Sequence, residues 1–195
     1  IYANSPISQG RLNGFCSKRA YIWRHTAPER TGTIPGIFHP DFNLESYVEY
    51  ALSVPLLFIV RNEQWVPAGK ITFGKFLKNG IAHFKAEPQD WPLHLTTIFT
   101  DVRLKQYIEI RGMDCQKTLL GLSAPALLKG LFYDELSRKK AWELFSDLAQ
   151  PERSKLSAQV PRKGLKTVFK NKTLREPATE LVYLAEQGLN RLAHK

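Results

Sequence analysis

Residues 103–114 read RLKQYIEIRGMD, a stretch in which charged and apolar residues alternate. Neighbouring side chains of a β-strand point to opposite faces of a sheet, so alternation of this kind predicts a strand. One face of that strand would carry Arg103, Lys105, Tyr107, Glu109 and Arg111, and the other would carry Leu104, Ile108 and Ile110. Two interpretations stay open: a wetted outer face over a core, or a phosphate and metal site with three cations around one carboxylate.

The composition around this stretch is typical of a globular protein. The chain has 195 residues, of which 43% are hydrophobic and 24% are charged. That length and apolar content are enough for one well-buried domain, which we expect to span residues 1–195. The longest apolar runs, at 54–60 and 119–128, fall short of the roughly 20 residues that span a bilayer, so we expect no membrane partner.

The part of the chain before residue 103 predicts a mixture of helices and strands. Residues 44–52 repeat apolar side chains at helical spacing, with Asp41 or Asn43 available as the N-cap. Residues 56–69 predict a strand, a polar turn and a short strand. Thr72 then suits the N-cap of a two-turn helix that a glycine ends.

The part after residue 111 predicts mainly helices. Apolar stripes indicate helices at 124–133, 137–148 and 178–193, and we expect residues 161–164 to form a loop. No internal repeat or change of composition marks a domain boundary. The sequence therefore predicts a single domain of the α+β class, with strands and helices segregated along the chain.

The net charge of +10 is concentrated in residues 151–175, where a single acid, Glu152, stands against eight basic residues: Arg153, Lys155, Arg162, Lys163, Lys166, Lys170, Lys172 and Arg175. A basic segment suits a solvated surface, a polyphosphate ligand such as a nucleotide, or nucleic acid. Only Phe169 interrupts this one with an aromatic ring, and no nucleic-acid-binding motif matches. We therefore expect no nucleic-acid partner.

The cysteines and histidines form no recognisable motif. Cys16 and Cys115 do not form a CxxC pair and are too few for a disulfide framework, which favours a reducing compartment, so we expect a cytoplasmic protein. The five histidines lack the spacing of a zinc site. The chain opens with IYANSP, without an initiator methionine or a signal peptide, so we interpret its start as a cut through a longer protein.

Nine short motifs, in this order, resemble the plant and proteobacterial type of glutamate–cysteine ligase. They are ANSP (3–6), NGF (13–15), IW (22–23), RTG (30–32), YVEYALSVP (47–55), HLTTIF (94–99), VRLK (102–105), YIEIRGMD (107–114) and VPRKGLKT (160–167). The resemblance runs from residue 1 nearly to the last residue. It implies that the chain is the middle and C-terminal part of such an enzyme, without the N-terminal part that supplies further metal-binding glutamates.

The resemblance implies a fold and a reaction. The fold would be glutamine-synthetase-like, an antiparallel sheet cradle backed by helices and incomplete at its N-terminus. The reaction would be the first step of glutathione biosynthesis, in which ATP and Mg²⁺ serve to join the γ-carboxylate of glutamate to the amine of cysteine through a γ-glutamyl phosphate. The partners would be small molecules, and we expect residues 1–195 alone to be inactive.

The resemblance also implies roles for single residues. Glu109 would bind the magnesium ion, and Arg111 would be catalytic by holding the transferring phosphate. Hard cations prefer carboxylate oxygen, and phosphoryl transfer depends on positioned cations. Arg103 and Lys105, on the same predicted face, are further candidates for binding nucleotide phosphates. The substrate-binding candidates are Arg19, for a substrate carboxylate, and Asn4, which equally suits a turn.

Two departures from the family concern the substrate pocket. Plant members read VPMYF where this chain reads VPLLF, so Leu57 replaces a tyrosine. The family segment GADGGPW is GMDCQKT here, so Thr118 replaces a tryptophan. Two alternatives therefore stay open: a related ligase that joins glutamate to another amine, and a catalytically incomplete chain.

Overall fold

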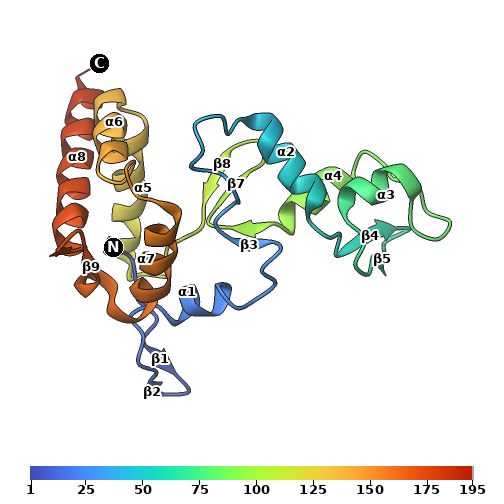
Figure 1. Cartoon of the computed structure of the whole chain (residues 1–195), viewed down its shortest axis with the longest axis horizontal. Helices are drawn as coiled ribbons and strands as arrows, with labels where there is room; N and C mark the ends of the chain where they lie inside the picture. Colours follow the sequence, from blue (N-terminus) through green and yellow to red (C-terminus); the bar gives the residue numbers. More distant parts are fainter. Residues whose placement is uncertain (195) are drawn as a thin grey trace. The chain divides into compact units, whose positions relative to one another are not determined.

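The computed structural model describes residues 1–194, and these fall into two compact units. Unit 1 contains residues 1–21 and 113–194, and unit 2 contains residues 22–112 (Figure 1). Helix α1 (Lys18–Trp23) spans the point at which the chain passes from unit 1 into unit 2. The expectation of one domain over the whole chain stays a prediction.

Unit 2 has the mixed character predicted for the first part of the chain. Its helices are α2 (Leu44–Ser53), α3 (Phe73–Asn79) and α4 (Asp90–Thr96), and its strands are β3 (Thr31–Gly32), β4 (Phe58–Arg61), β5 (Gln64–Pro67), β6 (Phe99–Thr100), β7 (Val102–Leu104) and β8 (Ile108–Ile110). Strands β4 and β5 pair antiparallel, as do β7 and β8, whereas β3 and β6 pair parallel.

Local sequence signals account for the helix ends in unit 2. Asn43 caps α2, where its side chain accepts a hydrogen bond from the Ser46 backbone N–H, so one of the two predicted caps is confirmed. Thr72 caps α3 in the same way, and Gly80 ends that helix at φ +70°. A Cβ at Gly80 would overlap the carbonyl oxygen of Phe84, so the position requires glycine.

The core of unit 2 consists of two clusters of fully buried apolar side chains. One contains Leu56, Ile59, Ala68, Phe73 and Phe76, and the other contains Ala51, Val54 and Ile98. The fully buried ring of His94 stacks on Phe73 with 4.5 Å between ring centroids. Ala51 of α2 packs against Ile98, and Leu52 packs against the first cluster, whereas Leu44 of the predicted apolar face is 63% exposed.

The stretch 103–111 is a hairpin, and the prediction of one continuous strand is wrong. Strands β7 and β8 pair antiparallel with Arg103 opposite Glu109, and the chain turns between them at residues 105–107. The pairing keeps Arg103 and Glu109 on one face and Leu104 and Ile108 on the other, as predicted, because directly opposed residues share a face. The expected burial of the two faces does not hold, since Arg103 is buried and Ile108 is 69% exposed. The polar residues that look like one face of a strand include those that make the turn.

Unit 1 is mainly helical, as predicted for the second part of the chain. Its helices are α5 (Thr118–Phe132), α6 (Glu135–Glu143), α7 (Gln150–Lys163), the 3₁₀ helix η1 (Gly164–Lys166) and α8 (Arg175–Ala193), and its two short hairpins pair β1 (Ile7–Ser8) with β2 (Arg11–Leu12) and β9 (Val168–Phe169) with β10 (Lys172–Thr173). Helix α8 coincides with the predicted helix to within three residues at its start.

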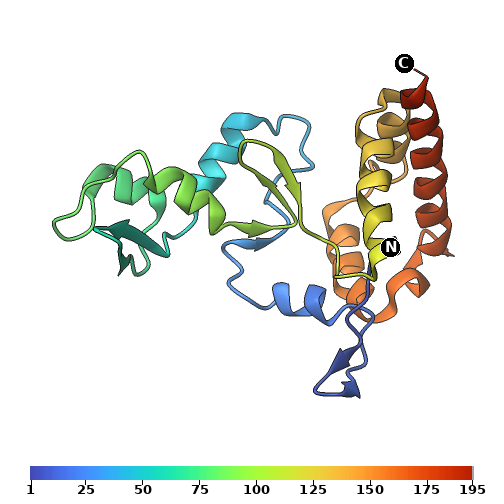
Figure 2. The ribbon, with the colours of Figure 1, turned by 180° about the vertical axis from the view of Figure 1, so that it is seen from behind.

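Helices α5 and α8 lie side by side in both views of the ribbon (Figures 1 and 2). A Cβ at Gly130 would overlap the carbonyl oxygen of Ala185, and one at Gly188 would overlap the carbonyl oxygen of Gly130. The two backbones are in contact at this point, which only glycine permits. Around the crossing, Leu131 and Leu184 form a buried apolar cluster with Ala185.

The helix boundaries in unit 1 correct three predictions. Helix α5 begins at Thr118, six residues before the predicted start, and α6 ends at Glu143 rather than at residue 148. Residues 161–163 belong to α7, so the predicted loop there is wrong. Pro161 lies in the last turn of α7 with its ring buried, and because proline has no N–H it cannot bond the carbonyl of Ser157 one turn earlier.

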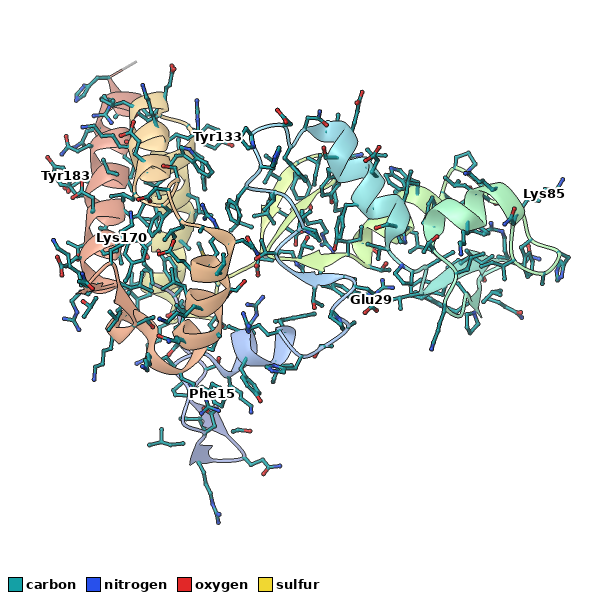
Figure 3. The ribbon with its side chains drawn as sticks, viewed as in Figure 1. Phe15, Glu29, Lys85, Tyr133, Lys170 and Tyr183 are labelled. Atoms are coloured by element: carbon teal, nitrogen blue, oxygen red, sulfur yellow. The ribbon has the colours of Figure 1, made fainter. Side chains whose placement is uncertain are left out.

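The outer surface of unit 1 carries large and charged side chains, including Tyr133, Lys170 and Tyr183 (Figure 3). Within residues 1–194, every sheet has two strands, and four of the five pairs are antiparallel. The fold is therefore a mixed one of helices and small, mainly antiparallel sheets. No helix in the described part of the chain has the length and apolar character needed to cross a membrane.

Candidate active site

The β7–β8 hairpin of unit 2 brings a buried arginine against a carboxylate. The Nε and Nη2 atoms of Arg103 both donate to Oε2 of Glu109, at 2.9 and 2.6 Å. The pairing follows from the register of the hairpin, which places the two residues directly opposite each other. The side chain of Arg103 is 8% exposed and that of Glu109 is 28% exposed.

A second arginine reaches the other oxygen of the same carboxylate. Nη1 of Arg111 donates to Oε1 of Glu109 at 2.9 Å, and the Arg111 guanidinium lies 5.7 Å from the centre of the Phe99 ring. The Arg111 side chain is 20% exposed, so solvent reaches it. The structure therefore brings Arg103, Glu109 and Arg111 together, as the opening stretch of sequence predicts, although through a hairpin.

The two arginines keep Glu109 ionised. The hydrogen bonds from Arg103 are the largest cause of a lowered Glu109 pKa; burial opposes them, and Arg111 adds to the lowering. The Glu109 carboxylate is therefore an anionic oxygen ligand between two cations, and the partly exposed group of Arg103, Glu109 and Arg111 forms one corner of unit 2. Such a group suits binding of a hard cation or orientation of an arginine toward a phosphate.

The hairpin is held by contacts from the rest of unit 2. Nη1 of Arg103 donates to the carbonyl oxygens of Thr96 and Ile98, at 2.6 and 3.1 Å. The hydroxyl of Tyr47, from α2, donates to the Leu104 carbonyl and accepts from the Leu104 backbone N–H, both at 3.0 Å. These contacts fix β7 to the elements on either side of it.

Lys105 occupies the turn of the hairpin. Its backbone N–H donates to the Tyr107 carbonyl at 3.0 Å, and its Nζ lies 5.9 Å from the centre of the Tyr107 ring. The side chain is only partly buried. Lys105 follows Arg103 by two residues but lies in the turn at the end of the hairpin. Its role in binding nucleotide phosphates stays a prediction.

Asn4 and Arg19 belong to unit 1, where the hydroxyl of Ser5 bonds both Asp114 and the backbone of Arg19. The Ser5 hydroxyl donates to Asp114 at 2.9 Å and accepts from the Arg19 backbone N–H at 3.1 Å. The Asn4 backbone N–H also donates to Asp114, at 2.7 Å, and its side-chain amide donates to the Cys115 carbonyl at 3.0 Å. These contacts fit the turn interpretation of Asn4, while the substrate-binding roles of both residues stay predictions.

Sequence reasoning missed Asp114 as a structural residue. This buried carboxylate accepts hydrogen bonds from Asn4 and Ser5 and from the Ser17 hydroxyl, at 2.9 Å for the last. Its partners lie 97 to 110 residues away in the chain. In the sequence, Asp114 and its partners Asn4 and Ser5 are marked only by belonging to the motifs YIEIRGMD and ANSP. The motifs alone do not indicate that these residues are in contact.

Sequence reasoning also missed the buried Arg30, which is 2% exposed. Its Nη1 donates to the carbonyl and hydroxyl oxygens of Thr97, both at 3.1 Å, and its Nη2 donates to the Pro55 carbonyl. Burial lowers the pKa of this guanidinium. Arg30 therefore links the segment before β3 to the ends of α2 and α4, a contribution to folding rather than to an open site.

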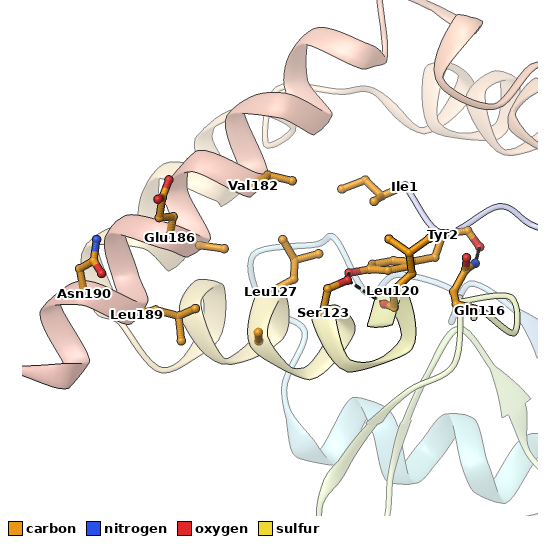
Figure 4. Close-up of a pocket in the computed structure, with 12 residues that line it drawn as sticks. Ile1, Tyr2, Gln116, Leu120, Ser123, Leu127, Val182, Glu186, Leu189 and Asn190 are labelled. Atoms are coloured by element: carbon orange, nitrogen blue, oxygen red, sulfur yellow. Dashed lines mark hydrogen bonds between the residues drawn. The ribbon is translucent and has the colours of Figure 1, made fainter. Parts of the chain in front are cut away.

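Unit 1 also contains an open pocket of about 460 Å³ between α5, α8 and the first two residues (Figure 4). Its wall is mainly apolar, with Leu120, Leu127 and Val182 among the lining residues. The Tyr2 hydroxyl bonds to that of Ser123 at 3.0 Å beside it. The predicted site residues Asn4 and Arg19 do not line this pocket.

The described residues offer few ligands for a metal. No group of three or more His, Cys, Asp or Glu side chains within residues 1–194 is placed to hold an ion. Glu109 fits a single ligand position, because it is ionised, partly exposed, and its Oε1 accepts only the Arg111 hydrogen bond at this corner. The chemistry of this oxygen suits Mg²⁺, which binds proteins through one or two carboxylates.

Comparison with known proteins identifies the family. The family model described as glutamate-cysteine ligase family 2 (GCS2) matches residues 1–195. The chain belongs to this glutamate–cysteine ligase family. It is 40% identical to a chloroplastic glutamate–cysteine ligase of Brassica juncea, 39% identical to glutamate–cysteine ligase A of Oryza sativa subsp. indica, and 37% identical to the enzyme of Nicotiana tabacum. The resemblance predicted from the nine motifs is confirmed.

These alignments cover the whole chain but only 38 to 40% of each relative. The chain therefore spans about two fifths of the length of the ligases it matches. All three relatives are named chloroplastic. The expectation of a cytoplasmic location is wrong by this comparison, because cysteine usage reports a reducing environment and does not distinguish one reducing compartment from another.

The two pocket departures lie in different units. Leu57, in unit 2, is 42% exposed at the start of the β4–β5 hairpin. Thr118, in unit 1, is exposed at the first position of α5. Both side chains are accessible to solvent, as a residue that contacts substrate must be before the substrate binds.

Proposed function

We propose that the protein to which this chain belongs is a glutamate–cysteine ligase, which uses ATP and Mg²⁺ to join the γ-carboxylate of glutamate to the amine of cysteine. The observation that carries the proposal is the Arg103–Glu109–Arg111 corner, within a chain that belongs to the glutamate–cysteine ligase family. The corner combines an ionised oxygen ligand with a partly exposed guanidinium, the two kinds of group that phosphoryl transfer requires.

The reaction has two steps. The γ-carboxylate of glutamate attacks the terminal phosphorus of ATP, which forms γ-glutamyl phosphate and releases ADP. The amine of cysteine then attacks the activated carbonyl carbon, loses a proton, and displaces inorganic phosphate to leave the amide. A bound Mg²⁺ would supply positive charge against the phosphate oxygens during the first step.

Each residue of the corner has a part in that scheme. Glu109 would give Mg²⁺ one carboxylate oxygen, and Arg111 would hold the phosphoryl group while negative charge spreads over its oxygens. Arg111 is suited to this because its side chain is 20% exposed while Glu109 fixes its orientation. Arg19 remains the candidate for a substrate carboxylate, since an arginine fork matches that geometry.

The larger context of the proposal comes from the family. We propose that the small antiparallel pairs of this chain belong to a glutamine-synthetase-like cradle that residues beyond the chain complete. The chain spans 38 to 40% of its relatives, and its described residues hold no complete metal site. Residues 1–195 alone are therefore expected to be inactive.

A different amine acceptor is the second candidate. Two observations favour it: Leu57 lacks the hydroxyl, and Thr118 the indole ring, of the corresponding residues in the family. Neither change touches the charged corner, so phosphoryl transfer from ATP would be retained while the choice of amine changed.

A coupling assay on the full-length protein tests the proposal. Mg²⁺, ATP and glutamate are supplied with cysteine or with a panel of other amines, and the products are separated by mass. γ-Glutamylcysteine as the main product is the expected result. A strong preference for an amine without a thiol would select the second candidate, and absence of ATP-dependent coupling with every amine would contradict both.

A further inference from the structure

We propose that Arg103 is a positioning residue, which fixes the Glu109 carboxylate so that Oε2 faces the interior of unit 2 and Oε1 faces Arg111 and the bound cation. The inference rests on the proposed function and deepens it. Arg103 makes four hydrogen bonds, two to backbone carbonyls and two to Oε2 of Glu109, and these leave Oε1 as the outer oxygen of the carboxylate.

The first step is that Arg103 is itself immobile. Its Nη1 donates to two backbone carbonyls, those of Thr96 and Ile98, at 2.6 and 3.1 Å. Both carbonyls lie in the segment that joins α4 to β6, and Ile98 is fully buried. With 8% of its side chain exposed, Arg103 has no room for another rotamer without breaking these bonds.

The second step is that this immobile fork holds only one oxygen of Glu109. Nε and Nη2 of Arg103 both donate to Oε2, at 2.9 and 2.6 Å, whereas Oε1 receives Nη1 of Arg111 at 2.9 Å. Each carboxylate oxygen has two lone pairs. The Arg103 bonds use both lone pairs of Oε2, so a cation is restricted to a single bond with Oε1.

The third step concerns the role predicted for Arg103 from the sequence. A residue that binds nucleotide phosphates needs donors that point into an accessible space. All three nitrogens of the Arg103 guanidinium donate within unit 2, and the side chain is buried. The geometry therefore assigns Arg103 to Glu109, and of the two arginines it is Arg111 that is exposed enough to meet a phosphate.

Arginine has a specific advantage at this position. Its planar fork reaches the carbonyls with one nitrogen and the carboxylate with the other two, which a lysine ammonium cannot do from one place. Residues that orient a metal ligand in this way commonly change metal affinity by about 10- to 100-fold when they are replaced. Arg103→Lys keeps the charge and removes the fork, so it isolates the effect of orientation.

The test is Mn²⁺ binding to the full-length protein, measured by electron paramagnetic resonance with Mn²⁺ as the only added metal. We expect Arg103→Lys to raise the Mn²⁺ dissociation constant by about tenfold or more. In a Glu109→Gln background, the same substitution should change the constant less than about twofold, because an effect that acts through Glu109 needs the carboxylate.

Arg61→Lys is the matched control. Arg61 is another arginine of unit 2 with little exposure, 10% of its side chain, and it holds a carboxylate, with Nη1 and Nη2 donating to Asp90 at 2.8 and 2.6 Å. Its replacement should destabilise the unit and leave the Mn²⁺ dissociation constant unchanged. If Arg103→Lys is not folded by circular dichroism, Arg103→Gln is judged by the same criterion, since its amide keeps one donor for Glu109.

Three results would overturn part of the scheme, and they are distinguishable. Equal shifts for Arg103→Lys and Arg61→Lys would mean that Arg103 only supports folding. A shift for Arg103→Lys that persists in the Glu109→Gln background would mean that Arg103 acts without the carboxylate. If Glu109→Gln alone leaves Mn²⁺ binding unchanged, the metal role of Glu109 fails, and the proposed function loses its metal ligand.

Discussion

Two of the arginine–carboxylate pairs in unit 2 differ in how the arginine fork meets the carboxylate and in how far the carboxylate is exposed. In the Arg61–Asp90 pair, the fork binds both oxygens, a backbone N–H of Glu87 adds a third bond at 2.8 Å, and the Asp90 side chain is 1% exposed. In the Arg103–Glu109 pair, the fork binds one oxygen and the carboxylate is 28% exposed. In the first pair (the closed pair) both carboxylate oxygens are bonded to the fork and buried, whereas in the second (the open pair) the carboxylate is partly exposed and Oε1 is bonded to Arg111 instead of to the fork.

An arginine–carboxylate ion pair can serve either to stabilise the fold or to orient a metal ligand. Both carboxylates have a lowered pKa. Burial would raise the pKa of Asp90 but is outweighed by its hydrogen bonds, whereas the Arg103 hydrogen bonds are the largest cause at Glu109. Both are therefore ionised at neutral pH. What separates a stabilising pair from a candidate ligand is the exposure of the carboxylate.

The largest expected effect is on the open pair. Glu109→Gln keeps the size of the side chain and removes its charge, so turnover of the full-length enzyme should fall at least about 100-fold, because the phosphoryl transfer site loses a preorganised charge. The free energy of unfolding should fall by about 2 kcal/mol, because the buried Arg103 loses its counter-charge while the glutamine amide oxygen can still accept its hydrogen bonds. Initial-rate assays with varied Mg²⁺ and urea titrations measure the two quantities.

Glu87→Gln serves as the control for that experiment. Glu87 also pairs with an arginine of little exposure, with 3.0 Å between its Oε1 and Nε of Arg61, and its side chain is 44% exposed. Its replacement should leave turnover within about twofold of the wild type, because it touches only the closed pair. Wild-type turnover in Glu109→Gln would contradict the difference between the two pairs.

The closed pair should show the opposite response. Asp90→Asn removes the buried counter-charge of Arg61 and leaves only the partly exposed Glu87 to pair with it, so the free energy of unfolding should fall by about 3 kcal/mol. At a temperature where the variant is folded, its kcat and its Mg²⁺ dependence should match the wild type. Differential scanning calorimetry and rate assays on the same sample check this, and a changed Mg²⁺ dependence would show that the closed pair also serves the site.

Acid provides a third test, because the lowered pKa of each carboxylate keeps both ionised in the folded protein as the pH falls into the range where His94 responds. Burial lowers the pKa of His94 to about 4, so the native ring stays neutral while the unfolded chain takes up a proton below about pH 6.5. The stability from this residue is complete above pH 6.5 and is lost as the pH falls toward 4, by about 1.4 kcal/mol per unit and about 3 kcal/mol in total.

Urea titrations of the full-length protein between pH 7 and pH 4 measure that loss. His94→Gln, whose amide can still donate to the Ala51 carbonyl that His94 Nε2 meets at 2.9 Å, should flatten the pH dependence in this range. An unchanged slope in the variant would assign the loss to other groups and would reopen the question of whether the carboxylates are protonated there.

The smallest expected effect comes from Tyr47 of α2, which contacts the β7–β8 hairpin. Tyr47→Phe removes the hydroxyl that bonds both backbone groups of Leu104, which supports the hairpin of the open pair and not the closed one. The free energy of unfolding should fall by about 1 kcal/mol. Turnover should fall less than tenfold, and hydrogen exchange of the Leu104 amide should become faster; an unprotected amide in the wild type would contradict the contact.

Several elements were predictable because their causes are local. The cap of α2 at Asn43, the cap of α3 at Thr72 and its end at Gly80 depend on side chains within four residues of the backbone groups they satisfy. The two strands within 56–69 were predictable for the same reason, since Asn62 and Glu63 adopt the positive φ of a tight hairpin turn.

Other elements were not predictable, because their causes lie far along the chain. Helix α7 continues to Lys163, while the Pro161 carbonyl accepts hydrogen bonds from the backbone of Cys16 and Ser17. The glycines at the α5–α8 crossing have no local signature, since glycine in a helix otherwise weakens it. In both cases the partner that makes the residue necessary belongs to a distant segment.

The sequence by itself determined the family, the mixed character of unit 2, the helical character of unit 1 and the presence of Arg103, Glu109 and Arg111 in one short stretch. Only the tertiary structure decided that this stretch is a hairpin, that Arg103 is buried, and that the partly exposed Glu109 bonds Arg103 through Oε2 and Arg111 through Oε1. The physical reason is that alternation fixes which residues are charged, whereas burial and hydrogen bonding depend on the carbonyls that other segments bring to the same place.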